Sequence, residues 1–158
     1  MNALTAGFGD EDLRRAILRS NQDLIPRNIA LRVRLSLNGA ETYLQRLYRE
    51  IELVSPLLAR DRPVVRLRFE GDDPATLGPA HKADLLESLT QHFALTPDAI
   101  AHSAQWPSDC DELGLGLGSV SRFGSTMAMN AAELADYCSA LDAGRLPVIA
   151  GRRAAPAD

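Results

Sequence analysis

Arginine is the residue whose placement suggests chemistry most directly in this 158-residue chain. Arg32 and Arg34 alternate with apolar residues in one segment, and Arg66 and Arg68 do so in another. Because successive side chains of a β-strand point to opposite faces, each pair lies on one face of its strand. If the two strands are neighbours, all four guanidinium groups share a face. Guanidinium groups bind carboxylates and phosphates through paired hydrogen bonds, so the pattern predicts an anion site.

The same arginines have a second interpretation. Long cationic side chains keep an uncovered sheet face in contact with water, which would make the four residues a solubilising surface rather than a binding site. The residue pattern alone leaves both interpretations open.

Alternating glycines from Leu113 to Gly118 form the second candidate site. They do not complete the nucleotide-binding pattern G-x-G-x-x-G, because the third glycine falls on Ser119 and no helical pattern follows at once. Glycine in a strand allows close approach of another backbone or of a flat ligand. We expect Gly114 and Gly116 to serve packing, with contact to a flat ligand as the alternative.

The residues that bind metals do not form a convincing site. Cys110 and Cys138 lie far apart, without C-x-x-C spacing, which indicates two reduced thiols. Glu70, Asp72 and Asp73 form an acidic turn, but a good calcium site takes about six to eight oxygen ligands. We expect a solvated turn there, with a weak magnesium or calcium site as the alternative, and we expect no metal site elsewhere.

The composition excludes several classes of protein. With 46% hydrophobic and 24% charged residues, the chain is typical of a soluble globular protein. A net charge of −4 without long charged blocks argues against nonspecific binding of nucleic acid. No apolar run approaches the roughly 18 residues of a membrane-spanning helix, and the first residues do not resemble a signal peptide. We therefore expect a cytoplasmic protein with neither nucleic acid nor membrane as a partner.

The elements that position these residues follow from hydrophobic periodicity. Helical spacing of apolar residues predicts helices over 10–20, 44–58 and 79–93. Alternation predicts strands over 29–37 and 65–69, and a further strand is expected near 99–105. An order of strand, helix, strand, helix, strand implies parallel pairing through crossover helices.

The last third of the chain changes character. The glycine segment and Thr126 to Asn130 predict a β-hairpin that turns near Arg122 to Ser125. A helix capped by Asn130 and stopped by Gly144 follows, and a short strand is expected over 147–150.

A chain of this length suits a single domain. We predict an α/β domain over residues 1–151, with an open, partial-barrel-like sheet of three parallel strands and crossover helices, plus a C-terminal β-hairpin and helix. Its parts are a helical lead-in over 1–28, a βαβαβ unit over 29–105, and a hairpin, helix and strand over 112–151. Residues 152–158 are expected to be a disordered tail.

Several segments carry a resemblance to a known family. They are Ile25-Pro26-Arg27, Leu31-x-Val33, Tyr43-Leu44, Glu50-Ile51, Val65-x-Leu67-x-Phe69, Leu113-Gly114-Leu115-Gly116, Met129-Asn130, Leu134, Tyr137, Leu141-Asp142-x-Gly144-x-Leu146-Pro147-Val148 and Gly151. In this order they resemble the oxygen-independent coproporphyrinogen III oxidases, the radical S-adenosylmethionine enzymes of anaerobic heme synthesis. The resemblance spans nearly the whole chain, as two pieces of a longer enzyme joined near 106–111. It places Arg32, Arg34 and Arg68 on the face that lines the family's barrel.

The chain departs from the family at three parts of its site. Asn38 stands where the family has the first cysteine of its cluster-binding triplet. Of the glycine-rich turn that holds S-adenosylmethionine, only Gly71 and Pro74 remain, and a residue near Ala104 replaces an expected glutamate. The comparison with the family therefore implies no iron-sulfur cluster, no bound S-adenosylmethionine and no catalytic residues.

Three functional hypotheses follow. The first is a degenerate, non-catalytic relative that acts as a small binding or regulatory protein for an anionic tetrapyrrole, using Arg32, Arg34, Arg66 and Arg68 together with Gly114 and Gly116. The second is a subunit or fragment that contributes to coproporphyrinogen III oxidation beside a partner protein. The third is a structural module that forms a homodimer through exposed sheet edges or arginine faces.

Overall fold

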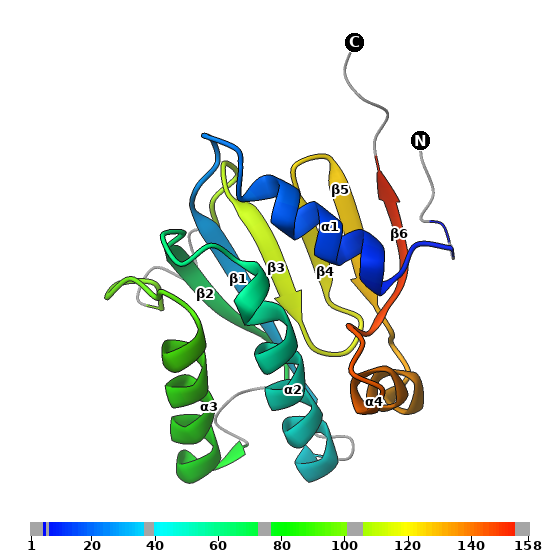
Figure 1. The fold of residues 1–158 in the computed structure, drawn as a ribbon. Helices are drawn as coiled ribbons and strands as arrows, with labels where there is room; N and C mark the ends of the chain where they lie inside the picture. The colour runs from blue at the N-terminus through cyan, green and yellow to red at the C-terminus, as the bar shows by residue number, and fades with distance from the viewer. Residues whose placement is uncertain (1–4, 6, 37–39, 73–76, 101–105, 154–158) are drawn as a thin grey trace.

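A computed structural model describes residues 5, 7–36, 40–72, 77–100 and 106–153 (Figure 1). Its elements, in chain order, are α1 (Asp10–Ser20), β1 (Ile29–Leu35), α2 (Ala40–Val54), the 3₁₀ helix η1 (Ser55–Leu57), β2 (Val64–Gly71), α3 (Pro79–His92), β3 (Asp111–Leu115), β4 (Val120–Phe123), β5 (Thr126–Asn130), α4 (Leu134–Asp142) and β6 (Val148–Arg153).

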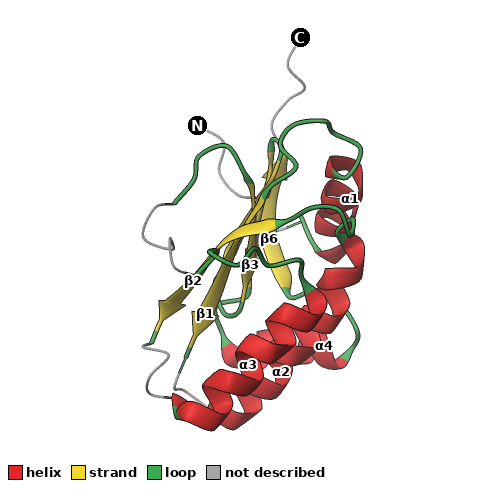
Figure 2. Cartoon of the chain, turned by 90° about the vertical axis from the view of Figure 1, so that its left-hand side faces the viewer, coloured by secondary structure: helices red, strands yellow, loops and turns green. Residues whose placement is uncertain are grey.

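The strands form one six-stranded sheet in the order β2-β1-β3-β4-β5-β6. β1 is parallel to β2 and to β3, whereas β3 to β6 pair antiparallel. The helices lie on one side of the sheet, as the turned view in Figure 2 shows. The predicted fold class, an open α/β sheet with three parallel strands, is confirmed.

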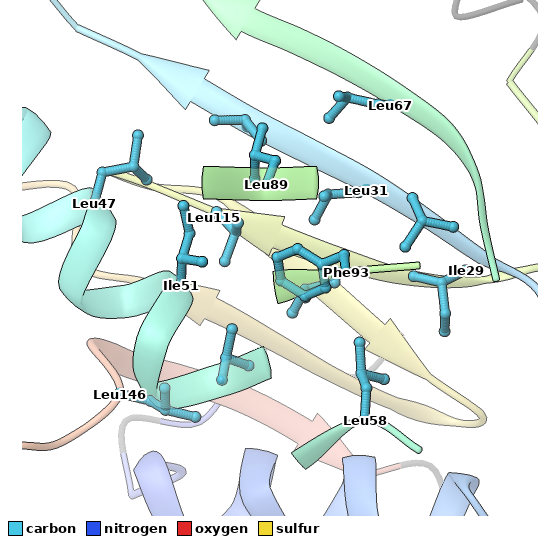
Figure 3. Packing of buried hydrophobic residues seen from close by; sticks show 14 of the residues in the cluster. Ile29, Leu31, Leu47, Ile51, Leu58, Leu67, Leu89, Phe93, Leu115 and Leu146 are labelled. Carbon is cyan, nitrogen blue, oxygen red and sulfur yellow. The ribbon is translucent and has the colours of Figure 1, made fainter. Parts of the chain in front are cut away.

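The core lies between the sheet and the helices because both contribute apolar faces. From β1, Ile29 and Leu31 point into this layer, where they meet Leu47 and Ile51 of α2 (Figure 3). Leu89 of α3 completes the contact from the neighbouring helix. The helical and alternating periodicities of the sequence thus produce two apolar surfaces that bury each other.

A buried ion pair fixes the start of β3. The Nη2 atom of Arg62 lies 2.6 Å from Oδ2 of Asp111, and both side chains are almost fully buried. Arg62 also donates to Oγ of Ser20 and to the carbonyl oxygen of Pro26. The pair therefore ties the end of α1 and the loop after it to the centre of the sheet.

The third parallel strand differs from the prediction. In the expected strand near 99–105, the described residues Ala99 and Ile100 form a turn, and 101–105 lie outside the described residues. The Ala99 carbonyl accepts a hydrogen bond from the Leu67 amide at 3.1 Å, so this segment follows the edge of β2. The strand parallel to β1 on its other side is β3, which the sequence analysis had placed in a hairpin. The predicted βαβαβ unit over 29–105 stays a prediction in its last strand, because 101–105 lie outside the described residues.

The C-terminal region contains the predicted strands and helix, but it differs from the prediction in the number of strands, the helix cap and the end of the last strand. The expected hairpin contains an additional strand, β4, which pairs with β3 and with β5. Glu133 precedes α4 as its N-cap, not Asn130, whose side chain is used elsewhere. Residues 152 and 153 continue β6 beyond the predicted boundary at 151, because they pair with β5. Gly144 does end the helix region, with a φ of +74°.

Candidate functional site

The predicted arginine face has the geometry that the alternation requires. β1 and β2 are neighbours, and Arg32 lies directly opposite Arg68 in their register. The apolar residues between the arginines belong to the core on the helix side, so the arginines point to the other side. Arg34 is exposed at the end of β1, and Arg66 donates a hydrogen bond to the carbonyl oxygen of Val65. We call this side of the sheet, opposite the helices, the open face.

Two of the arginines are held in a charged network on the open face. Nη2 of Arg32 lies 2.6 Å from a carboxylate oxygen of Glu112, and its Nε lies 3.9 Å from Glu70. Arg68 lies 4.0 Å from the same oxygen of Glu70. The ring of Trp106 stacks on both guanidinium groups, at 4.9 and 4.4 Å, and its Nε1 donates to Glu112 at 3.0 Å. Arg32 and Arg68 are therefore partly neutralised by neighbours in the chain.

The role of Trp106 could not be predicted from its sequence position, because it lies in a loop outside any periodic element. An aromatic ring over a guanidinium group is attracted electrostatically, which holds the loop against the sheet. The Nε atom of Arg32 is buried and has no hydrogen-bond partner among the described residues.

The open face continues over β4, β5 and β6, where the sequence analysis named no site. Its described side chains there are Val120, Arg122, Met127, Met129, Ala150 and Arg152. Met127 lies between Arg122 on β4 and Arg152 on β6 in the register. Arg122 is 55% exposed and lies 3.5 Å from Glu112. This part of the face combines flexible apolar side chains with cations on both sides.

The charge of the open face is strongly positive. Among the described residues of its strands, six arginines stand against two glutamates, a formal surplus of four positive charges. The whole chain carries a net charge of −4. Positive charge is therefore concentrated on one side of an otherwise acidic protein, which favours anionic ligands at that side.

The two candidate glycines serve packing within the chain. A Cβ atom at Gly114 would collide with the carbonyl oxygen of Val120. At Gly116 the φ angle is +104°, and a Cβ would meet the Tyr43 hydroxyl and the Arg34 carbonyl oxygen. The packing interpretation therefore has a physical reason, which is that a side chain at either glycine would collide with neighbouring atoms. Gly116 follows directly after β3, at a position with no room for a Cβ atom.

A buried carboxylate lies behind this glycine, on the helix side. Glu50 of α2 accepts hydrogen bonds from the Tyr137 hydroxyl at 2.7 Å, the Gly116 amide at 2.8 Å and the Asn130 side chain at 2.8 Å. Burial raises the pKa of Glu50 to about 7. These bonds join α2, α4, β3 and β5. In the sequence, Glu50 and Tyr137 were noted only as part of the family resemblance, Gly116 was a candidate glycine, and Asn130 was expected to cap a helix.

The remaining candidates do not come together. Cys110 is buried before β3, where burial and the neighbouring Asp109 raise its pKa to about 11, and Cys138 lies on α4. In the acidic turn, Glu70 pairs with arginine, and Asp73 lies outside the described residues, as do Asn38, Pro74 and Ala104. In the part of the chain that the structure describes, no group of three metal-ligating side chains occurs. None of its helices is long and apolar enough to cross a membrane.

The described residues form an open, mixed α/β sheet with parallel strands on one edge and no helix on the open face. Comparison with known proteins shows what this fold is related to. No family model matches the sequence. Over 56 residues the chain is 43% identical to the oxygen-independent coproporphyrinogen III oxidase of Pseudomonas aeruginosa, a match that takes in 35% of this chain and 12% of that protein.

The fold comparison covers much more of the chain. The solved coproporphyrinogen III oxidase of Escherichia coli, a radical S-adenosylmethionine enzyme, matches 96% of this chain and 77% of the solved chain, with a TM-score of 0.79 and 12% identity. The predicted relation to oxygen-independent coproporphyrinogen III oxidases is therefore confirmed, in sequence over a third of the chain and in fold over nearly all of it.

Proposed function

We propose that this chain is a non-catalytic relative of the coproporphyrinogen oxidases that binds an anionic tetrapyrrole on its open face. The observation that carries the proposal is the surplus of arginine on a sheet face that bears no helix in the described part of the chain. A coproporphyrin is flat and carries four carboxylates, so its shape and its charge both suit such a surface.

The non-catalytic part of the proposal rests on the residues available as ligands. Iron-sulfur clusters are held by several cysteine thiolates, commonly four. The chain has two cysteines, and they lie on different elements. Burial raises the pKa values of both, which disfavours the thiolate that a metal requires. The donor set of these 158 residues does not fit a cysteine-ligated cluster.

The placement of the ligand follows from the two halves of the face. Over β1 and β2, Trp106 and the two glutamates already contact Arg32 and Arg68. Over β4 to β6 the face offers methionine side chains, which adapt to apolar surfaces, beside Arg122 and Arg152. We expect the ring to lie on the methionines and its carboxylates to reach the arginines at either side.

Absorbance titration with coproporphyrin III tests this proposal. Saturable binding by the parent chain is expected. Replacing Arg122 and Arg152 with Gln should raise Kd about tenfold or more, since hydrogen bonds to charged groups contribute about 1.5 to 3 kcal/mol each. The dependence of Kd on salt should weaken as well, because charge is lost while polarity is kept. The variant Arg34→Gln/Arg68→Gln tests the first half of the face in the same way.

The control is Arg49→Gln/Arg60→Gln, which removes the same charge from exposed positions outside the open face. Its affinity should stay near that of the parent. The tetrapyrrole proposal is wrong if the parent shows no saturable binding, or if both open-face variants bind as tightly as the control.

A further inference from the structure

Two adjacent apolar residues are almost fully exposed in the loop between α1 and β1. Leu24 is 88% exposed and Ile25 is 85% exposed. Single exposed apolar residues are common on protein surfaces, but adjacent ones at such exposure mark a contact site more often. Asp23, which precedes them, is exposed as well. We call residues 23–25 the apolar tip.

The loop that carries the apolar tip is held in place by arginines. Nη1 of Arg27 donates to the carbonyl oxygens of Asn21 at 2.7 Å and of Asp23 at 3.1 Å. The buried Arg62 donates to the carbonyl oxygen of Pro26 at 3.2 Å. The tip is therefore presented by a fixed backbone, which reduces the conformational entropy that its binding would cost.

A groove with complementary chemistry runs along α1. It encloses about 540 Å³ between α1 and η1, and its apolar residues are Leu18 and Leu57. Leu18 is 50% exposed. Arg14, Arg15 and Arg19 line the same groove together with one acid, Glu11, and the side chain of Arg15 is 56% exposed. We call this feature the α1 groove.

The apolar tip and the α1 groove match each other in two respects. The tip offers two apolar side chains next to an acid, and the groove offers two leucines among three arginines and one glutamate, a surplus of two positive charges. We propose that the α1 groove of one copy of this chain binds the apolar tip of a second copy, forming a symmetric dimer. Both features belong to every copy, so a two-fold axis satisfies both contacts at once.

This interface differs from those that the sequence suggested, which were sheet edges and arginine faces. Its groove lies along α1, which is on the helix side of the sheet and not on the open face (Figure 2). It is therefore independent of the proposed tetrapyrrole site, and either proposal can fail without the other.

Sedimentation equilibrium of the full chain over a range of concentrations tests the dimer. The parent should be in a reversible equilibrium between monomer and dimer. Leu24→Ser/Ile25→Ser should shift it to monomer at concentrations where the parent is dimeric, with an unchanged thermal transition of the monomer because both side chains are exposed. Ile149→Ser, an exposed apolar residue on β6, is the matched control and should leave the dimer intact.

A charge exchange identifies the contact itself. In Asp23→Arg, the tip is cationic and is repelled by the groove arginines of the second copy. In Arg15→Asp/Arg19→Asp, the groove is acidic and repels Asp23 of the second copy. Each variant alone should therefore be monomeric. An equal mixture should form a heterodimer, because each tip then meets a groove of opposite charge. A parent that is monomeric throughout, a dimer that survives Leu24→Ser/Ile25→Ser, or a mixture that stays monomeric would overturn the proposed interface.

Discussion

Glu50 is the most unusual residue of the described structure, because it is a fully buried carboxylate held by neutral hydrogen-bond donors. It accepts hydrogen bonds from Tyr137, Asn130 and the Gly116 amide. These donors favour the ionised form, but the loss of solvation outweighs them and raises the pKa from 4.5 to about 7. Its position on α2 was visible in the sequence as an acid between the core residues Leu47 and Ile51, although its partners were not.

Glu50 should make the stability of the protein depend on pH. The folded state binds a proton more tightly than the unfolded state, so the contribution of this proton is complete below a pH of about 4.5 and is lost as the pH rises through about 7. The free energy of unfolding should fall across this window by up to about 3 kcal/mol from this group. In Glu50→Gln the corresponding fall should disappear, because the amide does not ionise.

Urea unfolding at a series of pH values measures this effect as the difference between parent and variant. Glu52→Gln, at an exposed position of the same helix, is the control and should follow the parent. Parallel curves for the parent and Glu50→Gln would contradict the assignment of the pH dependence to Glu50.

For the arginines of the open face, the sequence predicted which side of the sheet they occupy but not which residues they contact. Alternation was sufficient to place Arg32 and Arg68 on one face, because the period of a strand is local. Their contacts with Glu112 and Trp106 arise from segments far along the chain, and no local pattern indicates those contacts. The candidate site was therefore predicted in position, whereas its internal partners were not.

At the scale of elements, local periodicity predicted helices better than sheet order. The helix over 10–20 has the predicted bounds, and the strands containing the arginines are present. The third parallel strand was assigned to 99–105 because strand and helix usually alternate in sequence order. β3 is parallel to β1 on the side away from β2, through a long-range pairing, and its glycines had suggested a hairpin only.

The end of β3 should be intolerant of substitution. Gly116 has a φ of +104°, and its missing Cβ leaves room for the Tyr43 hydroxyl and the Arg34 carbonyl oxygen. Gly116→Ala should destabilise the fold by roughly 2 to 6 kcal/mol, since backbone strain and overpacking each cost about 1 to 3 kcal/mol. Chemical unfolding measures the change.

Gly118 provides the comparison within the same loop. It also has a positive φ, of +65°, but a methyl group at this position would have its nearest neighbour 3.9 Å away, on Ala132. Gly118→Ala should therefore cost only the backbone term, about 1 kcal/mol. Equal losses for the two variants would show that close packing at Gly116 is not what requires a glycine there.

At the scale of the whole molecule, the fold is one-sided. The helices and the core occupy one side of the sheet, and the arginine-rich open face occupies the other (Figure 2). The match to the solved coproporphyrinogen III oxidase extends over 96% of this chain, so the arrangement of elements is shared although the sequences are only 12% identical. The cationic open face is the part of this scaffold on which the proposed tetrapyrrole binding depends.

The methionines offer the most direct test of binding on the open face. The chain has three methionines, and two of them, Met127 and Met129, lie on the open face beside Arg122 and Arg152. With methyl-labelled methionine, NMR spectra recorded during addition of coproporphyrin III should show large ring-current shifts for Met127 and Met129. Saturable ligand binding without shifts at Met127 and Met129, or no binding at all, would contradict the account.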